Sequence, residues 1–194
     1  SCEGFWAGMP SFETIAFLVP DFLVICTDFL SSWRKEQFKY YKANRKKMPD
    51  ELQEQIPALY NIFKKSNIPL LKLDSYEADD VIGTFTKSVV HKENHTYIVS
   101  GDKDLMQLVN DSTSVYSLGN KFKPTTIYNK KKVIDKWQLP PDKIIDYLAL
   151  VGDSSDNIPG VQGVGPKTAV KLINEYGGVE NIYKSLDNIK NIKL

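Results

Sequence analysis

The sequence is poor in the two residue types that hold most disulfide frameworks and zinc sites together. Its 194 residues include only two cysteines, Cys2 and Cys26, and only two histidines. Nothing in their placement resembles the disulfide framework of a secreted domain or the spacing of zinc ligands. Because Cys26 lies in the apolar run FLVICT, we expect a buried free thiol and a reducing compartment.

Long hydrophobic runs and nucleotide-binding loops are missing as well. The apolar runs are far shorter than the roughly 20 residues that a membrane-spanning helix needs, so we expect no membrane partner. No signal or transit peptide is visible, and the opening SCEGFWAGMP leads us to expect a truncated chain. The sequence has no Walker loop and no GxGxxG motif, which disfavours NTPases and dehydrogenases.

A large net charge is also absent, because 25 Lys+Arg residues balance 24 Asp+Glu residues. The two signs are nevertheless segregated along the chain. Basic residues dominate 34–47, whereas acidic residues gather at 74–80, 102–104 and 153–156. A balanced total with separate basic and acidic segments suits an enzyme with an anionic substrate and a cationic cofactor.

The hydrophobic pattern of residues 1–138 predicts an α/β domain. Short β-rich runs at 22–27 and 97–100, with a weaker one at 70–73, are typical of buried parallel strands. Helical patterns cover 50–65, where we expect Pro57 to cause a kink, and about 76–91. Strands that alternate with helices indicate a mostly parallel sheet flanked by helices.

Residues 139–194 have a different texture. They show a helix entered through Pro140 and Pro141, a glycine-punctuated hairpin and two further helical patterns, with no strand pattern. We expect a small second domain made only of helices.

Acidic residues follow each of the three predicted strands. Open α/β sheets bind ligands at the carboxyl ends of their strands, so these carboxylates should share one rim, and two acids of the second domain could reach it. The candidates are Asp28, Glu77, Asp79, Asp80, Asp102, Asp104, Asp153 and Asp156. Carboxylates without His or Cys partners suit Mg²⁺ or Mn²⁺, and this number predicts two ions and metal-assisted phosphodiester hydrolysis.

The stretch WRKEQFKYYKANRKK, residues 33–47, interleaves aromatic residues with cations. As an amphipathic helix it would expose its lysines and pack its aromatics, and we favour that interpretation for Lys35, Lys39 and Lys47. Lys42 and Arg45 are three residues apart and would share a helical face above the acidic rim. We expect them to hold the scissile phosphate, with aromatic rings available to stack on a single strand.

The segment GDSSDNIPGVQGVGPKTA, residues 152–169, contains Gly160, Gly163 and Gly165 before a helix that Pro166 begins. Glycines just before a helix N-terminus let backbone N–H groups approach a phosphate, and Lys167 adds charge. Helical hairpins also need glycine for structural reasons alone, so this signal is weak without the nearby acids.

Four motifs together, YEADDVIGT, SGDKDLMQLV, LVGDSSDNIPGVQGVGPKTA and YKANRKKMPDEL, resemble the 5′-3′ exonuclease or flap endonuclease domain of the bacterial DNA polymerase I family. The resemblance runs from about Pro20 to the C-terminus. It implies a nuclease core with a basic arch at about 33–48 and a helix–three-turn–helix at about 156–176. The family removes 5′ flaps and RNA primers with two divalent metal ions, and often holds K⁺ in the helix–three-turn–helix.

By this resemblance the eight acids take metal-site roles, and Asp80, Asp102, Lys42 and Arg45 take catalytic roles. DNA contacts are expected from Arg34, Lys42, Arg45, Gly160, Gly163, Gly165, Lys167 and Thr168. The family's first strand, which ends in Asp-Gly, has no counterpart in this sequence. We expect a monomer that binds flapped DNA or an RNA primer on DNA, in the bacterial cytoplasm or in a plastid or mitochondrion.

Two alternatives remain at this point. The missing first strand favours a catalytically impaired module that binds branched DNA. An RNA-cleaving nuclease of similar fold would also cluster carboxylates on a sheet rim, although it does not require a duplex-gripping glycine hairpin.

Overall fold

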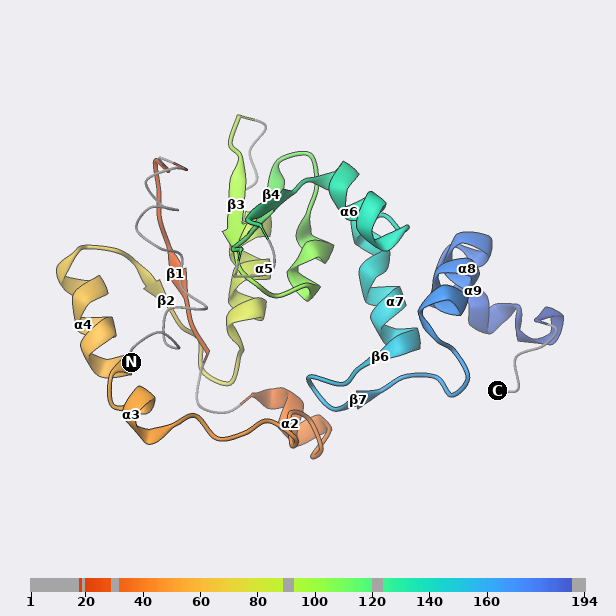
Figure 1. Cartoon of the computed structure of the whole chain (residues 1–194), viewed down its shortest axis with the longest axis horizontal. Coiled ribbons are helices and arrows are strands. Elements are labelled where there is room, and N and C mark those ends of the chain that lie inside the picture. The colour runs from red at the N-terminus through yellow and green to blue at the C-terminus, as the bar shows by residue number, and fades with distance from the viewer. Residues whose placement is uncertain (1–17, 19, 29–31, 89–92, 120–123, 190–194) are drawn as a thin grey trace.

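The computed structural model describes residues 18, 20–28, 32–88, 93–119 and 124–189 (Figure 1). Its α-helices (α), 3-10 helices (η) and strands (β) follow one another as β1 (Ile25–Cys26), α2 (Trp33–Gln37), α3 (Asp50–Gln53), α4 (Ile56–Lys65), β2 (Leu70–Leu71), α5 (Ala78–Ser88), β3 (Thr96–Val99), η3 (Asp104–Leu108), β4 (Thr113–Ser117), β5 (Thr126–Tyr128), α6 (Lys130–Trp137), η4 (Pro141–Lys143), α7 (Ile144–Val151), β6 (Gly152–Asp153), β7 (Ile158–Pro159), α8 (Pro166–Tyr176), α9 (Val179–Lys184) and η5 (Leu186–Asn188).

The expected α/β fold is confirmed, with its strands divided between small sheets. β1 pairs with β2 in parallel, and β3 pairs with β4 in parallel while β5 runs antiparallel to β4. All three predicted strands are present. β1 and β2 are shorter than their apolar runs, and β3 has four residues but begins one residue earlier than predicted. The expectation of no strand after residue 138 is wrong, because β6 and β7 form a short antiparallel hairpin.

Proline sets two of the helix boundaries. Pro57 does not kink a single helix at 50–65 but lies in the first turn of α4, where a missing N–H costs nothing. α3 therefore ends at Gln53, before the proline. Pro166 likewise begins α8, which ends at Tyr176 and is capped by Gly177 in the left-handed region with φ +85°.

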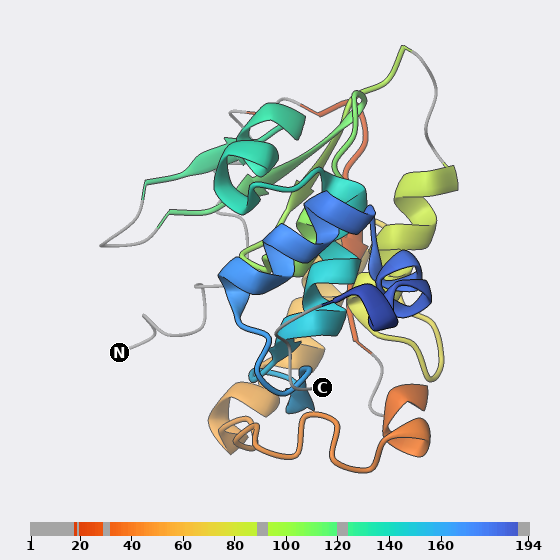
Figure 2. The same ribbon diagram turned by 90° about the vertical axis from the view of Figure 1, so that its right-hand side faces the viewer.

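Two apolar clusters hold the fold together, and α7 contributes to both. The first surrounds Val115, Val133 and Ile144, which are fully buried. The second surrounds Leu139 and Ala169 and joins α7, α8 and α9. Figure 1 shows the α/β elements on one side and α8 and α9 on the other, with α7 between them, and Figure 2, viewed from the second side, shows α8 and α9 in front of α7.

The sequence also led us to expect a buried thiol at Cys26 and no membrane-spanning helix. Cys26 is a free thiol that is only half-buried, and burial raises its pKa. Over the described ranges, no helix combines the length and apolarity that crossing a bilayer requires.

The β6–β7 hairpin leaves no room for a side chain at Gly160. A Cβ there would overlap the carbonyl group of Val151 and would lie 2.7 Å from the Gly152 nitrogen. We expect Gly160→Ala to lower the free energy of unfolding by about 2 kcal/mol, because backbone atoms cannot yield as a flexible side chain can. Thermal unfolding measures this. Gly101→Ala is the matched control, because a Cβ at Gly101 meets nothing within 4 Å; equal losses for both variants would contradict the explanation.

Candidate metal and nucleic-acid site

The acid that follows β1 meets the start of α5. Asp28 Oδ1 accepts a hydrogen bond of 2.7 Å from the backbone N–H of Ala78, the first residue of α5. An N–H in the first helical turn has no partner within the helix, so this carboxylate satisfies it. The negative charge of the carboxylate is in turn stabilised by the positive end of the helix dipole. The parallel pairing of β1 with β2 thus brings Asp28 to the segment that carries Glu77, Asp79 and Asp80.

The acids that follow β3 lie in the electrostatic field of this group. Asp102 Oδ1 accepts a 2.8 Å hydrogen bond from the Asp104 N–H, which forms the turn into η3. Surrounding protein atoms and the charges of Asp102 and Asp28 raise the pKa of Asp79 to about 6, although its side chain keeps contact with solvent. Carboxylates from the ends of β1 and β3 therefore act on the same side chain of α5.

An acid of the second domain joins the same cluster through Asp104. Burial, and then the charges of Asp102 and Asp153, raise the pKa of Asp104 to about 7. Burial opposes ionisation of Asp153 too, but the Ser155 N–H at 2.8 Å and the Lys103 ammonium at 3.6 Å hold its pKa below its usual value. Two carboxylates, one from each domain, thus crowd together at this point.

Basic side chains pair with the remaining acids. Arg34 forms two hydrogen bonds, of 2.6 and 2.7 Å, with the two carboxylate oxygens of Asp80. These bonds lower the pKa of Asp80. The same guanidinium lies 3.9 Å from Glu77, so the two acids three residues apart do share a side of α5, as their spacing predicts.

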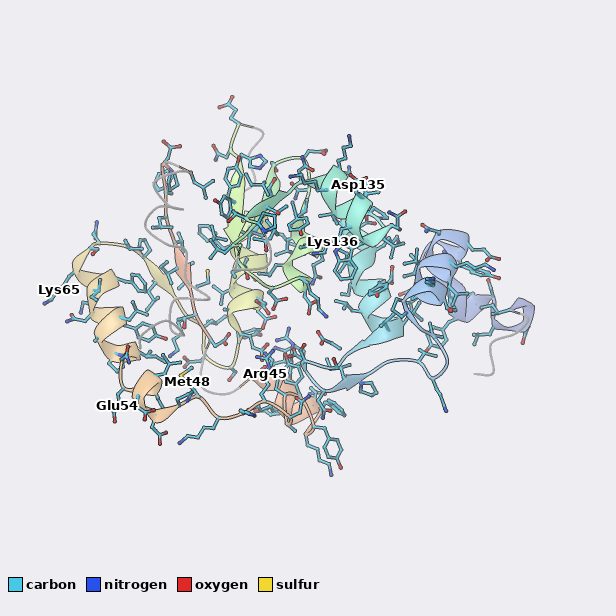
Figure 3. All side chains as sticks on the ribbon, viewed as in Figure 1. Arg45, Met48, Glu54, Lys65, Asp135 and Lys136 are labelled. Atoms are coloured by element: carbon cyan, nitrogen blue, oxygen red, sulfur yellow. The ribbon has the colours of Figure 1, made fainter. Side chains whose placement is uncertain are left out.

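Lys42 and Arg45 both reach the acidic cluster. The Lys42 ammonium lies 2.8 Å from Glu77 Oε2 and 3.9 Å from Asp156 Oδ2. Arg45 pairs with the other oxygen of Asp156 at 2.5 Å. Figure 3 shows Arg45 on the segment after α2, in the lower part of the view, and Lys136 on α6 above it.

These contacts do not come from a shared helical face, so that expectation is wrong. α2 ends at Gln37, and Lys42 adopts a left-handed conformation with φ +56°. The chain bends there because it bonds to the loop between β6 and β7: the Lys42 N–H donates to the Asp156 carbonyl at 2.9 Å, and the Asn44 amide donates to the Ser154 carbonyl at 2.7 Å. Long-range bonds thus override the amphipathic pattern.

One of the aromatic residues expected to be available for stacking is not. Tyr41 is only 5% exposed, and its hydroxyl lies 2.9 Å from Glu77 Oε2. Trp33 and Tyr40 are 40% and 53% exposed, respectively. Sequence reasoning missed the polar role of Tyr41, and the only local signal is its position next to Lys42.

The acidic residues suit a divalent cation chemically, but they do not converge tightly. Among the described residues, no group of three or more His, Cys, Asp or Glu has an arrangement that could hold a metal ion. Two features still favour cation binding. Asp104 Oδ1 is buried with no hydrogen-bond partner among the described atoms, and the raised pKa values of Asp79 and Asp104 mean that added positive charge would stabilise their ionised forms. The donors are hard oxygens, which fit Mg²⁺ or Mn²⁺.

Gly163 and Gly165 lie on the stretch that runs from β7 to α8 (Figure 1). Gly163 has φ +81°, and Gly165 precedes α8 with no side-chain hydrogen bond capping that helix end. A Cβ at either glycine would meet nothing within 4 Å, so these two, unlike Gly160, have open space around them. Lys167 is exposed and Thr168 is half-buried in the first turn of α8.

Comparison with known proteins identifies the family. The model described as "5'-3' exonuclease, N-terminal resolvase-like domain" matches residues 11–138, and "5'-3' exonuclease, C-terminal SAM fold" matches residues 139–194. A 5′-3′ exonuclease of Aquifex aeolicus is 43% identical over 172 residues, covering 88% of this chain and 58% of that protein. DNA polymerase I of Caldicellulosiruptor bescii is 42% identical over 174 residues, covering 88% of this chain and 20% of that protein.

Solved structures agree with these matches. The phage T5 5′-exonuclease with bound zinc ions has a TM-score of 0.78 and 26% identity, over 93% of this chain and 70% of that one. A bacteriophage T5 flap endonuclease in complex with DNA and metal ions has a TM-score of 0.78 and 25% identity, with the same two coverages. The chain thus spans about a fifth of the polymerase relatives and 58% of the Aquifex exonuclease. It belongs to the 5′-3′ exonuclease family, which occurs both in stand-alone exonucleases and within DNA polymerase I.

Proposed function

We propose that the chain is the nuclease part of a structure-selective 5′-3′ exonuclease and flap endonuclease, which hydrolyses DNA phosphodiesters with two divalent metal ions. The observation that carries this proposal is the electrostatic coupling of Asp79, Asp102, Asp104 and Asp153, which come from three separate parts of the chain. Its substrates would be 5′ flaps and RNA primers met in replication and repair. The relatives crystallised with DNA and metal ions support the same assignment.

The proposed roles follow from where each side chain lies. One group of metal ligands would consist of Asp79, Asp102, Asp104 and Asp153. The metal site would be completed by Asp28, Glu77, Asp80 and Asp156. A divalent ion bound there would supply positive charge that stabilises the negative charge developing on the phosphodiester. Arg34, Lys42 and Arg45 already lie among the carboxylates, so an entering phosphate would meet cations from the basic segment.

The second domain would grip the duplex. The uncapped N-terminus of α8, with Gly163, Gly165, Lys167 and Thr168 around it, offers backbone N–H groups and one ammonium to a phosphate. The same helix–three-turn–helix, about 156–176, is where a K⁺ ion is proposed. The protein would act as a monomer, in the bacterial cytoplasm or in an organelle.

A labelled 5′-flap duplex tests this function directly. We expect cleavage near the flap junction in Mg²⁺ or Mn²⁺ and none in EDTA. The test uses the full-length protein. Absence of product with both metals would refute the nuclease assignment.

A module that only binds branched DNA is the second candidate. It is favoured by the ion pairs that engage Glu77, Asp80 and Asp156 and by the lack of a tight acidic group within the described residues. Flap affinity that survives EDTA, with no cleavage over long incubation, would support it.

Arg45 should contribute to the salt dependence of DNA binding. Its side chain is 51% exposed and lies beside the proposed path of the substrate. Arg45→Ala removes one phosphate contact, so the slope of log affinity against log salt should become shallower by about one unit. Fluorescence anisotropy at several KCl concentrations measures the slope. Lys47→Ala is the control, because Lys47 is more exposed and pairs with Asp50 in its own segment; its slope should match wild type, and an unchanged slope for Arg45→Ala would place that residue off the DNA path.

Divalent-cation affinity should rise steeply with pH up to about 7. With a pKa of about 7, Asp104 holds a proton at lower pH, and a cation must displace this proton to bind. We therefore expect the affinity for Mn²⁺ to fall about tenfold for each pH unit below 7, and more steeply below 6, where Asp79 also protonates. Isothermal titration at pH 5.5 to 8, with circular dichroism to check folding, measures it. A flat profile would show that Asp104 takes no part.

A further inference from the structure

Tyr41 is the buried centre of the contacts between the two domains. Its hydroxyl lies 2.9 Å from Glu77 Oε2 and 3.1 Å from Asp156 Oδ2, and the residue is only 5% exposed. Glu77 directly precedes α5, whereas Asp156 lies in the loop between β6 and β7. One hydroxyl therefore bridges carboxylates that are 79 positions apart in sequence.

The backbone on both sides of Tyr41 is fixed to the same loop. The side-chain amide of Asn157 donates to the Tyr40 carbonyl at 2.8 Å, and the backbone N–H of Lys42 donates to the Asp156 carbonyl at 2.9 Å. These two bonds hold residues 40 and 42 and leave the Tyr41 side chain directed into the protein. The position of the hydroxyl is thus set by main-chain contacts rather than by packing of the ring alone.

Tyr41 and Lys42 converge on one oxygen atom. Glu77 Oε2 accepts from the Tyr41 hydroxyl at 2.9 Å and from the Lys42 ammonium at 2.8 Å. The ammonium also lies 4.9 Å from the centre of the Tyr41 ring. Lys42 thus has three neighbours, Glu77, Asp156 and the ring, and Tyr41 contacts each carboxylate directly.

We propose that Tyr41 is a positioning residue for the proposed nuclease site: its hydroxyl orients the Glu77 and Asp156 carboxylates across the domain boundary and thereby places Lys42. This inference rests on the proposed function of those three residues. The phenol hydroxyl has a single proton, so it donates a hydrogen bond to one carboxylate at a time. It can alternate between Glu77 and Asp156 because both carboxylates lie within hydrogen-bonding distance. Hydrogen-bond partners that orient ligands in this way typically contribute about 10- to 100-fold to metal affinity or activity.

The hydroxyl is separable from the ring. Tyr41→Phe keeps the aromatic volume in the buried position and removes only the oxygen, which leaves Glu77 with Lys42, Arg34 and Ser32 as nearby donors. Burial and the hydrogen bond to Glu77 raise the pKa of Tyr41, so the group removed is a neutral donor and no net charge is lost. Tyr183→Phe removes the same atom from a residue that is 67% exposed on α9 and serves as the matched control.

The experiment compares wild type, Tyr41→Phe and Tyr183→Phe on a 5′-flap substrate. We expect the single-turnover rate of Tyr41→Phe in Mg²⁺ to fall at least about tenfold and the Mn²⁺ binding midpoint to rise. Flap affinity in Ca²⁺ and the thermal midpoint should change little, because ring packing and the backbone bonds remain. Tyr183→Phe should match wild type in all four measurements.

The outcomes separate this inference from the function on which it rests. An inert wild type would refute the nuclease function. An active wild type with an equally active Tyr41→Phe would refute the positioning role alone, and so would a loss explained fully by weaker flap binding or by unfolding. A second comparison uses Glu77→Gln as the background. Adding Tyr41→Phe should then reduce the rate by clearly less than it does in wild type, because one of the two carboxylates that the hydroxyl orients is already changed, whereas a loss as large as in wild type would overturn the role of Tyr41 at Glu77.

Discussion

Asp102→Ala should reduce the rate of flap cleavage by about 10³-fold or more while leaving flap affinity in Ca²⁺ within about twofold. Loss of charge stabilisation by a metal site is worth several kcal/mol in the transition state, and about 1.4 kcal/mol corresponds to a tenfold change in rate. Asp102 interacts electrostatically with two other acids of the cluster, because its charge raises the pKa of Asp79 and that of Asp104. Removing it should therefore affect the whole group and not one ligand alone.

Two further variants separate the charge of Asp102 from its structural bond. Asp102 Oδ1 accepts from the Asp104 N–H, so Asp102→Ala could also loosen the turn into η3. Asp102→Asn keeps an acceptor oxygen at that position and removes only the charge, and we expect it to be nearly as inactive. Asp111→Asn controls for the loss of a surface carboxylate, because the Asp111 side chain is 92% exposed and its one ion pair within the described part of the chain is with Lys130, at 3.7 Å. Single-turnover rates decide the matter: wild-type cleavage by Asp102→Asn would mean that the acidic cluster is not the reaction centre.

The sequence predicts which strand ends carry acids, because this depends on chain direction rather than on packing detail. Asp28 and Asp102 each follow a strand that has a parallel partner. These strands belong to two separate sheets, so the acids do not share the rim of one sheet that we expected. The three-residue spacing of Glu77 and Asp80 predicts that they lie on one side, and both do lie within 4 Å of Arg34. Local pattern and chain direction suffice for such features.

The basic segment and the second domain show what such patterns cannot supply. The 33–47 stretch has the periodicity of a helix, yet only its first five residues are helical, because Lys42 and Asn44 bond to a loop more than 100 residues away. β6 and β7 are two residues long and carry no alternating pattern, so no window of sequence could indicate them. The bridge made by Tyr41 likewise joins atoms 36 and 115 positions apart, and its sequence context suggested only an aromatic ring among cations.

Glu77→Leu should lower the free energy of unfolding by about 3 kcal/mol, the largest stability effect we expect from one of the site carboxylates. The Glu77 and Lys42 side chains are only 9% and 16% exposed, so removing the carboxylate leaves a poorly solvated ammonium without its nearest counter-charge. Burial opposes the ionised form of Glu77, but Lys42 and Tyr41 outweigh it and lower the pKa. For a chain of this size the loss corresponds to a fall of about 10 °C in the thermal midpoint.

A double variant tests whether the unpaired charge is the cause. Glu77→Leu combined with Lys42→Met replaces the ion pair by apolar side chains, which often restores stability because no charge then remains to be solvated. We therefore expect the double variant to be more stable than Glu77→Leu alone, although both should be inactive. Asp50→Asn, which breaks an ion pair whose side chains are 78% and 76% exposed, should change stability by less than about 0.5 kcal/mol. Additive losses in the double variant would show that packing around Glu77, and not its pairing with Lys42, stabilises the contact between α5 and the basic segment.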